Sequence, residues 1–124
     1  MTAAPQVLDL AEKFSAFDDH WLPHVVGQVN GQELRVAKFE GRFEWHSHAD
    51  TDELFLVVQG EFQMHFRDRS ETVRAGQLIV VPRGVEHCPE AAREVHVLML
   101  EAPGTLNTGE NPESERTHRE LPEL

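Results

Sequence analysis

The chain has 124 residues, which is enough for one domain with a hydrophobic core but not for two. Its formal net charge is −11, so nucleic acids and anionic membranes are excluded as partners that bind through charge. No apolar run reaches the roughly 18 residues that a membrane-spanning helix needs.

The predicted secondary structure consists almost entirely of strands. The helical spacing of Leu10, Phe14 and Phe17 predicts one short helix within residues 9–19. After it, short apolar segments alternate with turns rich in glycine, proline and charged residues, which is typical of strands. Eight strands are predicted, at residues 25–29, 34–39, 43–48, 54–59, 62–66, 72–75, 78–81 and 95–101.

The turns between these segments indicate the fold class. Asn30-Gly31, between the first two strands, suits a type I′ hairpin because both central residues of that turn need positive φ. Many short strands joined by frequent turns favour a β-sandwich or barrel. Residues 103–124 have few apolar side chains, and we expect them to form an extended tail on the barrel, with partial disorder as the alternative.

His46 and His48 are the first candidate metal ligands. They are two residues apart in a predicted strand, so both side chains leave the same face and could chelate one cation. A carboxylate ligand is expected after these histidines, but the spacing does not decide between Asp52 and Glu53. Asp52 keeps the same face at an even offset, whereas Glu53 needs the turn-like residues before it to reset the alternation. His87 follows an apolar strand and a Pro-Arg-Gly turn, and taken alone it is more typical of a loop histidine.

Two segments resemble the motifs of the cupin superfamily. Residues 41–60 read G-x4-HxH-x4-E-x6-G, which is similar to the first cupin motif with one residue fewer before the first histidine. Residues 76–87 read G-x5-P-x-G-x2-H, which is similar to the second motif, although Ala91 stands where an asparagine commonly ends it. The 15 residues between the motifs are typical of small single-domain cupins described as mannose-6-phosphate isomerase-like. FDDHWLPHVV and GTLNTGE are weaker marks of the same group.

This resemblance implies an all-β fold, the cupin double-stranded β-helix or jelly-roll barrel, with a short N-terminal helix and an extended C-terminal tail. One cupin domain would then cover residues 1–124, with a barrel core at about 25–102, an N-terminal segment at 1–24 and a tail at 103–124.

The resemblance also implies a metal site, and it favours Glu53 over Asp52. The implied ligands of one divalent transition metal ion are His46, His48, Glu53 and His87. Three imidazoles and a carboxylate suit Fe, Mn, Ni, Zn, Co or Cu, whereas calcium and magnesium prefer shells of oxygen alone.

Few other polar side chains are candidates for catalysis. His96, His65 and Gln63 are possible pocket residues, although a core role for His96 and a solvated face for the other two are the simpler interpretations. We expect Trp21 to have a packing or surface role beside the first strand, and Cys88 to be a small buried apolar side chain.

Two hypotheses for the function follow. The first, which we favour, is a metalloenzyme of dioxygenase, isomerase or lyase type, acting on a small organic or sugar-like molecule that chelates the metal. The second is a non-catalytic module that binds or senses a small ligand. The lone Cys88 and the absence of a secretory signal indicate a cytoplasmic protein, and exposed strand edges predict a homodimer, with neither nucleic acid nor membrane as partner.

Overall fold

The computed structural model describes residues 5–124, so the first four residues of the N-terminal segment lie outside the described residues. Helix α1 spans Leu10–Ser15, within the predicted range, and begins where the Asp9 side chain accepts a hydrogen bond from the backbone N–H of Glu12. In residues 5–124, no helix has the length and apolar character needed to cross a membrane.

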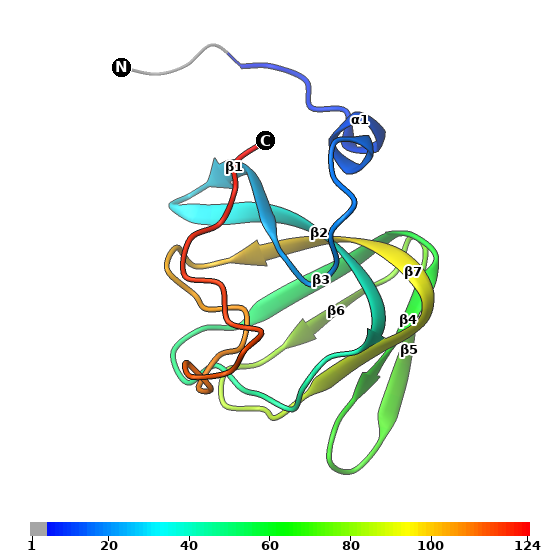
Figure 1. Ribbon diagram of the computed structural model, residues 1–124, viewed down its shortest axis with the longest axis vertical. Helices are drawn as coiled ribbons and strands as arrows, with labels where there is room; N and C mark the ends of the chain where they lie inside the picture. The colour runs from blue at the N-terminus through cyan, green and yellow to red at the C-terminus, as the bar shows by residue number, and fades with distance from the viewer. Residues whose placement is uncertain (1–4) are drawn as a thin grey trace.

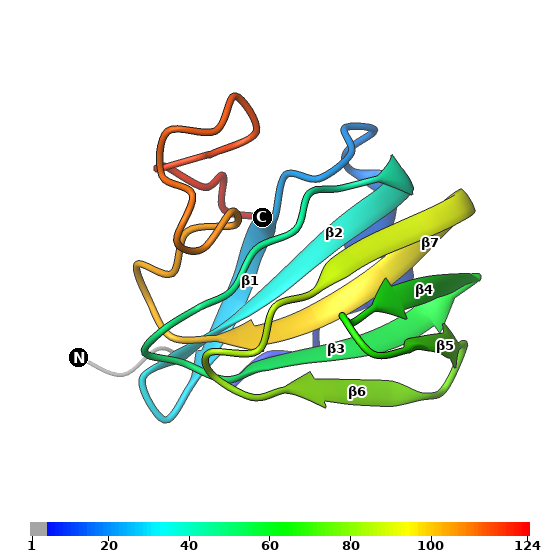
Figure 2. The same cartoon turned by 90° about the horizontal axis from the view of Figure 1, so that it is seen from below.

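The strands form an antiparallel barrel, as the sequence predicts (Figure 1). They are β1 (His24–Val29), β2 (Gln32–Arg42), β3 (Glu53–Gln59), β4 (Glu61–His65), β5 (Ser70–Arg74), β6 (Leu78–Val81) and β7 (Cys88–Glu101). Five of them lie in the order β1-β2-β7-β3-β6, and β7 also pairs with β4, which pairs with β5 (Figure 2). The long strand β7 therefore links both sides of the barrel.

The turn between β1 and β2 is the predicted two-residue hairpin. Val29 pairs with Gln32, and both residues between them have positive φ, 52° for Asn30 and 76° for Gly31. Such angles are those that a type I′ turn requires.

The prediction of a strand at 43–48 is wrong. After Arg42 the chain runs irregularly, and its one bridge is between His46 and His87, whose backbone N–H groups donate to each other's carbonyls at 3.0 and 2.9 Å. A single bridge leaves the backbone free to bend, so the segment is a loop on the barrel. Burial alternates only over residues 46–48, since the neighbours Glu44 and Trp45 are both half-buried.

β7 begins at Cys88, seven residues before the predicted start at residue 95. Its first half, Cys-Pro-Glu-Ala-Ala-Arg-Glu, contains a proline and three charged residues, which are unusual in a central strand. Pairing with β4 and with the end of β2 extends the strand through this stretch.

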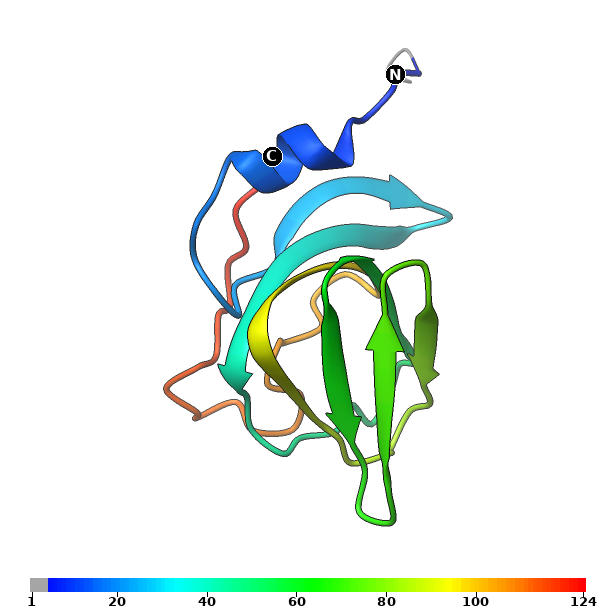
Figure 3. The same ribbon diagram turned by 90° about the vertical axis from the view of Figure 1, so that its right-hand side faces the viewer.

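Two apolar clusters pack on opposite sides of β2 and β7. Inside the barrel, Phe39, Phe55 and Phe62 pack with aliphatic side chains of the other strands. Outside, Phe14 of α1 packs with Val36 of β2, so that the helix covers the outer face of the sheet (Figure 3). Burying one such aromatic side chain stabilises the fold by roughly 2–3 kcal/mol.

The C-terminal tail lies on the barrel, but most of it is a series of turns instead of extended chain. At its end the chain pairs with the edge of β1: the N–H of Val25 donates to the carbonyl of Pro122 at 2.8 Å, and the N–H of Leu124 to the carbonyl of Val25 at 2.9 Å. Figure 1 shows the C-terminal end of the chain beside β1.

Candidate metal centre

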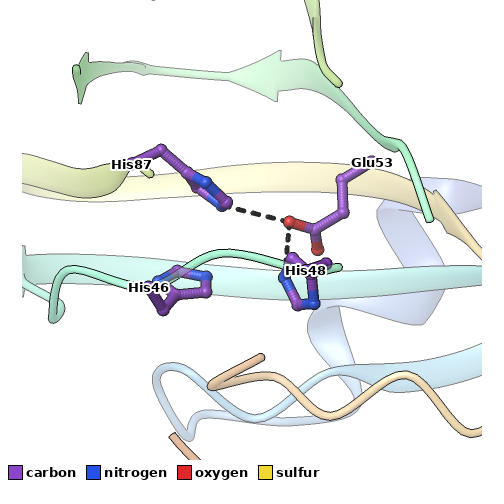
Figure 4. A group of neighbouring side chains, drawn as sticks. All are labelled: His46, His48, Glu53 and His87. Carbon is purple, nitrogen blue, oxygen red and sulfur yellow. Dashed lines mark hydrogen bonds and ion pairs between the residues drawn. The ribbon is translucent and has the colours of Figure 1, made fainter. Parts of the chain in front are cut away.

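The structure brings His46, His48, Glu53 and His87 together inside the barrel (Figure 4). One nitrogen or oxygen atom from each residue lies within 4.8 Å of those of the other three, and the side chains are 0 to 6% exposed. They come from the loop after β2, the first residue of β3 and the residue before β7. This group could hold a metal ion.

Glu53, and not Asp52, is the carboxylate of this group. Asp52 is exposed, and its Oδ1 accepts a hydrogen bond from the backbone N–H of Arg83 at 2.9 Å. That bond, aided by the nearby guanidinium of Arg83, lowers the pKa of Asp52. The side chain of Glu53 points inward and is only 2% exposed. The residues before β3 therefore reset the alternation of inward and outward side chains, so that Glu53 points inward.

Backbone hydrogen bonds tie the loop of His46 and His48 to the turn before His87. Besides the bridge between His46 and His87, the N–H of Gly84 donates to the carbonyl of His48 at 2.8 Å. The imidazoles of His46 and His48 consequently lie together, with ring centroids 5.2 Å apart, although their segment is not a strand.

Hydrogen bonds to carbonyl groups set the tautomers of two of the histidines. Nδ1 of His46 donates to the carbonyl of Glu44 and Nδ1 of His87 to that of Val85, both at 2.9 Å. Because a carbonyl can only accept, Nδ1 carries the proton, and in the neutral ring Nε2 keeps its lone pair. Metal-binding histidines in proteins are commonly held in this way.

The pKa values of Glu53 and His46 favour the protonation states that bind metal ions. Burial by itself raises the pKa of Glu53, but the imidazoles of His48 and His87 beside the carboxylate outweigh it and lower that pKa to about 2. Burial, followed by the charge of His87, lowers the pKa of His46 to about 4. At neutral pH the carboxylate is therefore ionised and the His46 ring neutral, which are the forms that bind metals.

One buried nitrogen in the group lacks a hydrogen-bond partner. Nε2 of His48 lies 2.8 Å from Oε1 of Glu53, but the angles are unsuitable for a hydrogen bond, so the contact is only electrostatic. A buried polar atom without a partner is costly. A cation among three imidazole nitrogens and one carboxylate oxygen would satisfy it, and this donor set fits a divalent transition metal ion.

A narrow, mostly apolar pocket reaches His46 and Glu53. Trp21 forms part of its wall, with its ring stacked on Phe39 at 4.4 Å and on Phe43 at 4.8 Å between centroids. The φ of Trp21 is 64°, which is uncommon for a bulky residue. This role of Trp21 could not be predicted, because no local sequence pattern links residue 21 to the end of β2.

His96, His65 and Gln63 are not brought into the group. The ring of His96 stacks on Phe14 of α1, with centroids 4.5 Å apart. On β4, Phe62 and Met64 are the inward residues, so Gln63 and His65 point outward.

These outward side chains have partners of their own on the barrel surface. Nδ1 of His65 lies 2.6 Å from Oγ of Ser70, and its Nε2 lies 2.8 Å from Oε1 of Glu90. Oε1 of Gln63 accepts a hydrogen bond from Oγ1 of Thr72 at 3.0 Å. Cys88, by contrast, is fully buried, as expected.

Comparisons with known proteins agree with the fold and the motifs. Residues 28–103 match the model of the family described as Cupin domain. The crystal structure of a cupin-2 domain containing protein from Shewanella frigidimarina is 44% identical, with a TM-score of 0.76 over 77% of this chain and 94% of that one. The structure of protein NMB1881 from Neisseria meningitidis is 26% identical, with a TM-score of 0.72 over 78% of this chain and 99% of that one.

A curated relative is the uncharacterized protein YdbB of Bacillus subtilis, which is 38% identical over 63 residues. This match covers 50% of the chain and 56% of YdbB, so the chain spans about half the length of that relative.

Proposed function

The chain belongs to the cupin domain family, and we propose that it is a metal-dependent enzyme that acts on a small organic molecule bound at the metal. The observation that carries this proposal is the buried group of His46, His48, Glu53 and His87, in which Nε2 of His48 has no hydrogen-bond partner. The reaction would be of dioxygenase, isomerase or lyase type.

The four residues would hold one divalent ion of Fe, Mn, Ni, Zn, Co or Cu. Such an ion supplies a Lewis acid and, if it is redox-active, one-electron chemistry. The carbonyls of Glu44 and Val85 hold His46 and His87 in the tautomer that presents Nε2. Glu53 adds a single negative charge, so the site would keep part of the ion's positive charge for a second anionic ligand.

The apolar lining of the pocket beside the group favours a compact organic substrate over a sugar, and its cavity of about 20 Å³ would have to widen to admit either. Its wall is built mainly of aromatic and apolar side chains such as Trp21, Phe43 and Met99, and none of the described residues that line it is a lysine or arginine. A sugar or phosphosugar presents several hydroxyl or phosphate groups, each of which needs a partner when buried. A molecule with an apolar body and one chelating end meets the pocket's chemistry better.

The alternative is a non-catalytic module that senses or carries such a ligand. One observation favours it: apart from the candidate ligands, the described residues that line the pocket include no general acid or base. The N–H groups of Trp21 and Asn107, which also line it, already donate to backbone carbonyls. Substrate activation would then depend on the metal alone. The homodimer and the cytoplasmic location remain predictions from the sequence.

A reconstitution experiment separates the two functions. The metal-free protein is loaded with each of the six ions in turn and incubated in air with a panel of small catechols, 1,3-diketones and 2-oxo acids. Product formation measured by mass spectrometry supports the enzyme. A rise in the melting temperature with a panel compound, without product, supports the binding module. A protein that takes up none of the ions contradicts both.

A further inference from the structure

The tail packs against the loop that carries His46 and His48, outside the part of the chain that matches the cupin family model, which ends at residue 103. We propose that residues 105–117, here named the bracing segment, position these two histidines for metal binding. This inference rests on the metal site proposed above, and it assigns to the tail a role in forming that site.

Glu110 holds the peptide groups on both sides of His48. Its backbone N–H donates to the carbonyl of Ser47 at 2.9 Å, and its Oε1 accepts a hydrogen bond from the N–H of Ala49 at 3.0 Å. Peptide groups are planar, so fixing the two that flank a residue restricts its φ and ψ. The direction in which the His48 side chain leaves the backbone is therefore set in part by Glu110.

Asn111 holds the peptide group before His46. Its side-chain Nδ2 donates to the carbonyl of Trp45 at 2.9 Å. The peptide group after His46 is held by the N–H of His87, which donates to the His46 carbonyl. The backbone of His87 thus holds the peptide groups on both sides of His46, and the bracing segment adds a second contact to the one before it.

A further contact fixes Glu44, whose carbonyl accepts the Nδ1–H of His46. The hydroxyl of Ser114 donates to the Glu44 carboxylate at 2.7 Å. The residue that orients the His46 ring is therefore itself tied to the bracing segment.

Gly109 allows the bracing segment to approach the loop this closely. A Cβ atom at this position would lie 2.0 Å from the carbonyl oxygen of Ser47 and 3.3 Å from Cε1 of His48. The first distance is far below any van der Waals contact, so a larger residue would push the backbone next to His48 away. Gly104 differs: it also has a positive φ, but nothing lies within 4 Å of a Cβ there.

The bracing segment has internal hydrogen bonds and an anchor on the barrel. Nδ2 of Asn107 donates to the carbonyl of Arg116 at 2.7 Å, and the hydroxyl of Thr108, which is fully buried, donates to the carbonyl of Asn111 at 3.0 Å. At its start, Nη1 of the buried Arg35 donates to the carbonyl of Thr105 at 3.1 Å. The segment is therefore held in place independently of the histidines that it contacts.

Two glycine variants test the proposal. Gly109→Ala and Gly104→Ala both place alanine at a positive φ, but only the first meets the backbone of the histidine loop. Three quantities are compared with the wild type: the dissociation constant for Co²⁺ from a competition titration, the visible absorption spectrum of bound Co²⁺, and the melting temperature of the metal-free protein.

We expect Gly109→Ala to weaken Co²⁺ binding by roughly 10- to 100-fold, as loss of groups that orient ligands does, and to change the spectrum. Gly104→Ala should keep wild-type affinity and spectrum, with a smaller loss of melting temperature because only its positive φ is unfavourable. Wild-type affinity in Gly109→Ala, or an equal loss of affinity in both variants, would overturn the proposal.

A second pair covers the case in which Gly109→Ala does not fold. Glu110→Ala removes the acceptor for the N–H of Ala49, whereas Glu110→Gln keeps a side-chain oxygen without the charge. The alanine variant should lose Co²⁺ affinity and the glutamine variant should retain it. Equal losses would mean that Glu110 acts through its charge and not by positioning, against the proposal.

The wild-type result separates this inference from the metal site on which it rests. If the wild type binds Co²⁺ and neither Gly109→Ala nor Glu110→Ala changes its affinity or spectrum, only the role of the bracing segment is lost. If the wild type binds no metal, the metal site and the bracing role both fail.

Discussion

Nε2 of His48 lies 2.8 Å from Oε1 of Glu53 in the barrel interior, yet it makes no hydrogen bond. A buried imidazole nitrogen next to an ionised carboxylate is stable only if a proton or a cation lies near both. Nε2 of His46, whose Nδ1 carries the proton, presents its lone pair to the same region, and Nε2 of His87 lies 3.1 Å from the same oxygen of Glu53. The proposed metal site depends on that arrangement.

Metal addition should stabilise the protein. An ion at 100 times its dissociation constant stabilises the folded state by about 2.7 kcal/mol, so the metal-free protein should melt several degrees higher after addition of Zn²⁺ or Ni²⁺. His65→Ala, which changes an outward histidine of β4, serves as control and should respond like the wild type. An equal response from Glu53→Gln would argue that the ion binds elsewhere.

The choice of carboxylate can be tested by a pair of amide variants. Glu53→Gln should weaken Mn²⁺ binding at least roughly tenfold because it removes the one anionic ligand. Asp52→Asn should bind like the wild type, since Asp52 is exposed and its Oδ1 contacts Arg83. Isothermal titration of both variants checks this, and the opposite order of affinities would make Asp52 the ligand.

The two tryptophans should report on metal binding differently. Trp21 lines the same pocket as His46 and Glu53, whereas the ring of Trp45 lies against the guanidinium of Arg67, 3.9 Å from its centroid. In Trp45→Phe, where Trp21 is the remaining tryptophan, addition of Cu²⁺ should quench the fluorescence strongly. Trp21→Phe should show weaker quenching. Equal quenching in the two variants would place Trp21 no nearer the metal than Trp45.

The buried pair of Arg35 and Glu101 should stabilise the metal-free protein. Both residues are 1% exposed and they form an ion pair, and Arg35 also pairs with Glu33 at 2.8 Å. Removing one partner leaves the other charge buried, which costs about 3–5 kcal/mol. Urea unfolding of metal-free Arg35→Met should show a loss of that size, and the double variant Arg35→Met/Glu101→Leu should recover much of it. A single variant as stable as the wild type would mean that the pair adds nothing.

Strand periodicity and motif spacing predicted much of this molecule. The two-residue spacing of His46 and His48 indicated that their side chains lie on the same side of the backbone. They do lie together, although the strand predicted for them is a loop. The choice between Asp52 and Glu53 depended on how the residues before β3 turn, and the hydrogen bond from the backbone of Arg83 to Asp52 decides it. No local pattern contains that contact, because it joins residues 31 apart in the chain.

The early start of β7 and the packing of the bracing segment could not be predicted from the local sequence either. Both depend on contacts between residues far apart in the chain. Pro89 and the charged residues after it weaken the strand pattern, and pairing with β4 overrides them. The side chain of Asn111 donates to the carbonyl of Trp45, which is 66 residues away in the chain. The tail has few apolar side chains, so its sequence does not indicate where it packs.

The most direct test of the metal site is the metal content of the untagged protein purified from its own host, compared with that of His48→Ala, His87→Ala and the control His65→Ala. The account predicts close to one transition metal ion per chain in the wild type and in His65→Ala, measured by inductively coupled plasma mass spectrometry. It predicts little or none in His48→Ala and His87→Ala. Full metal content in these two variants would contradict the site.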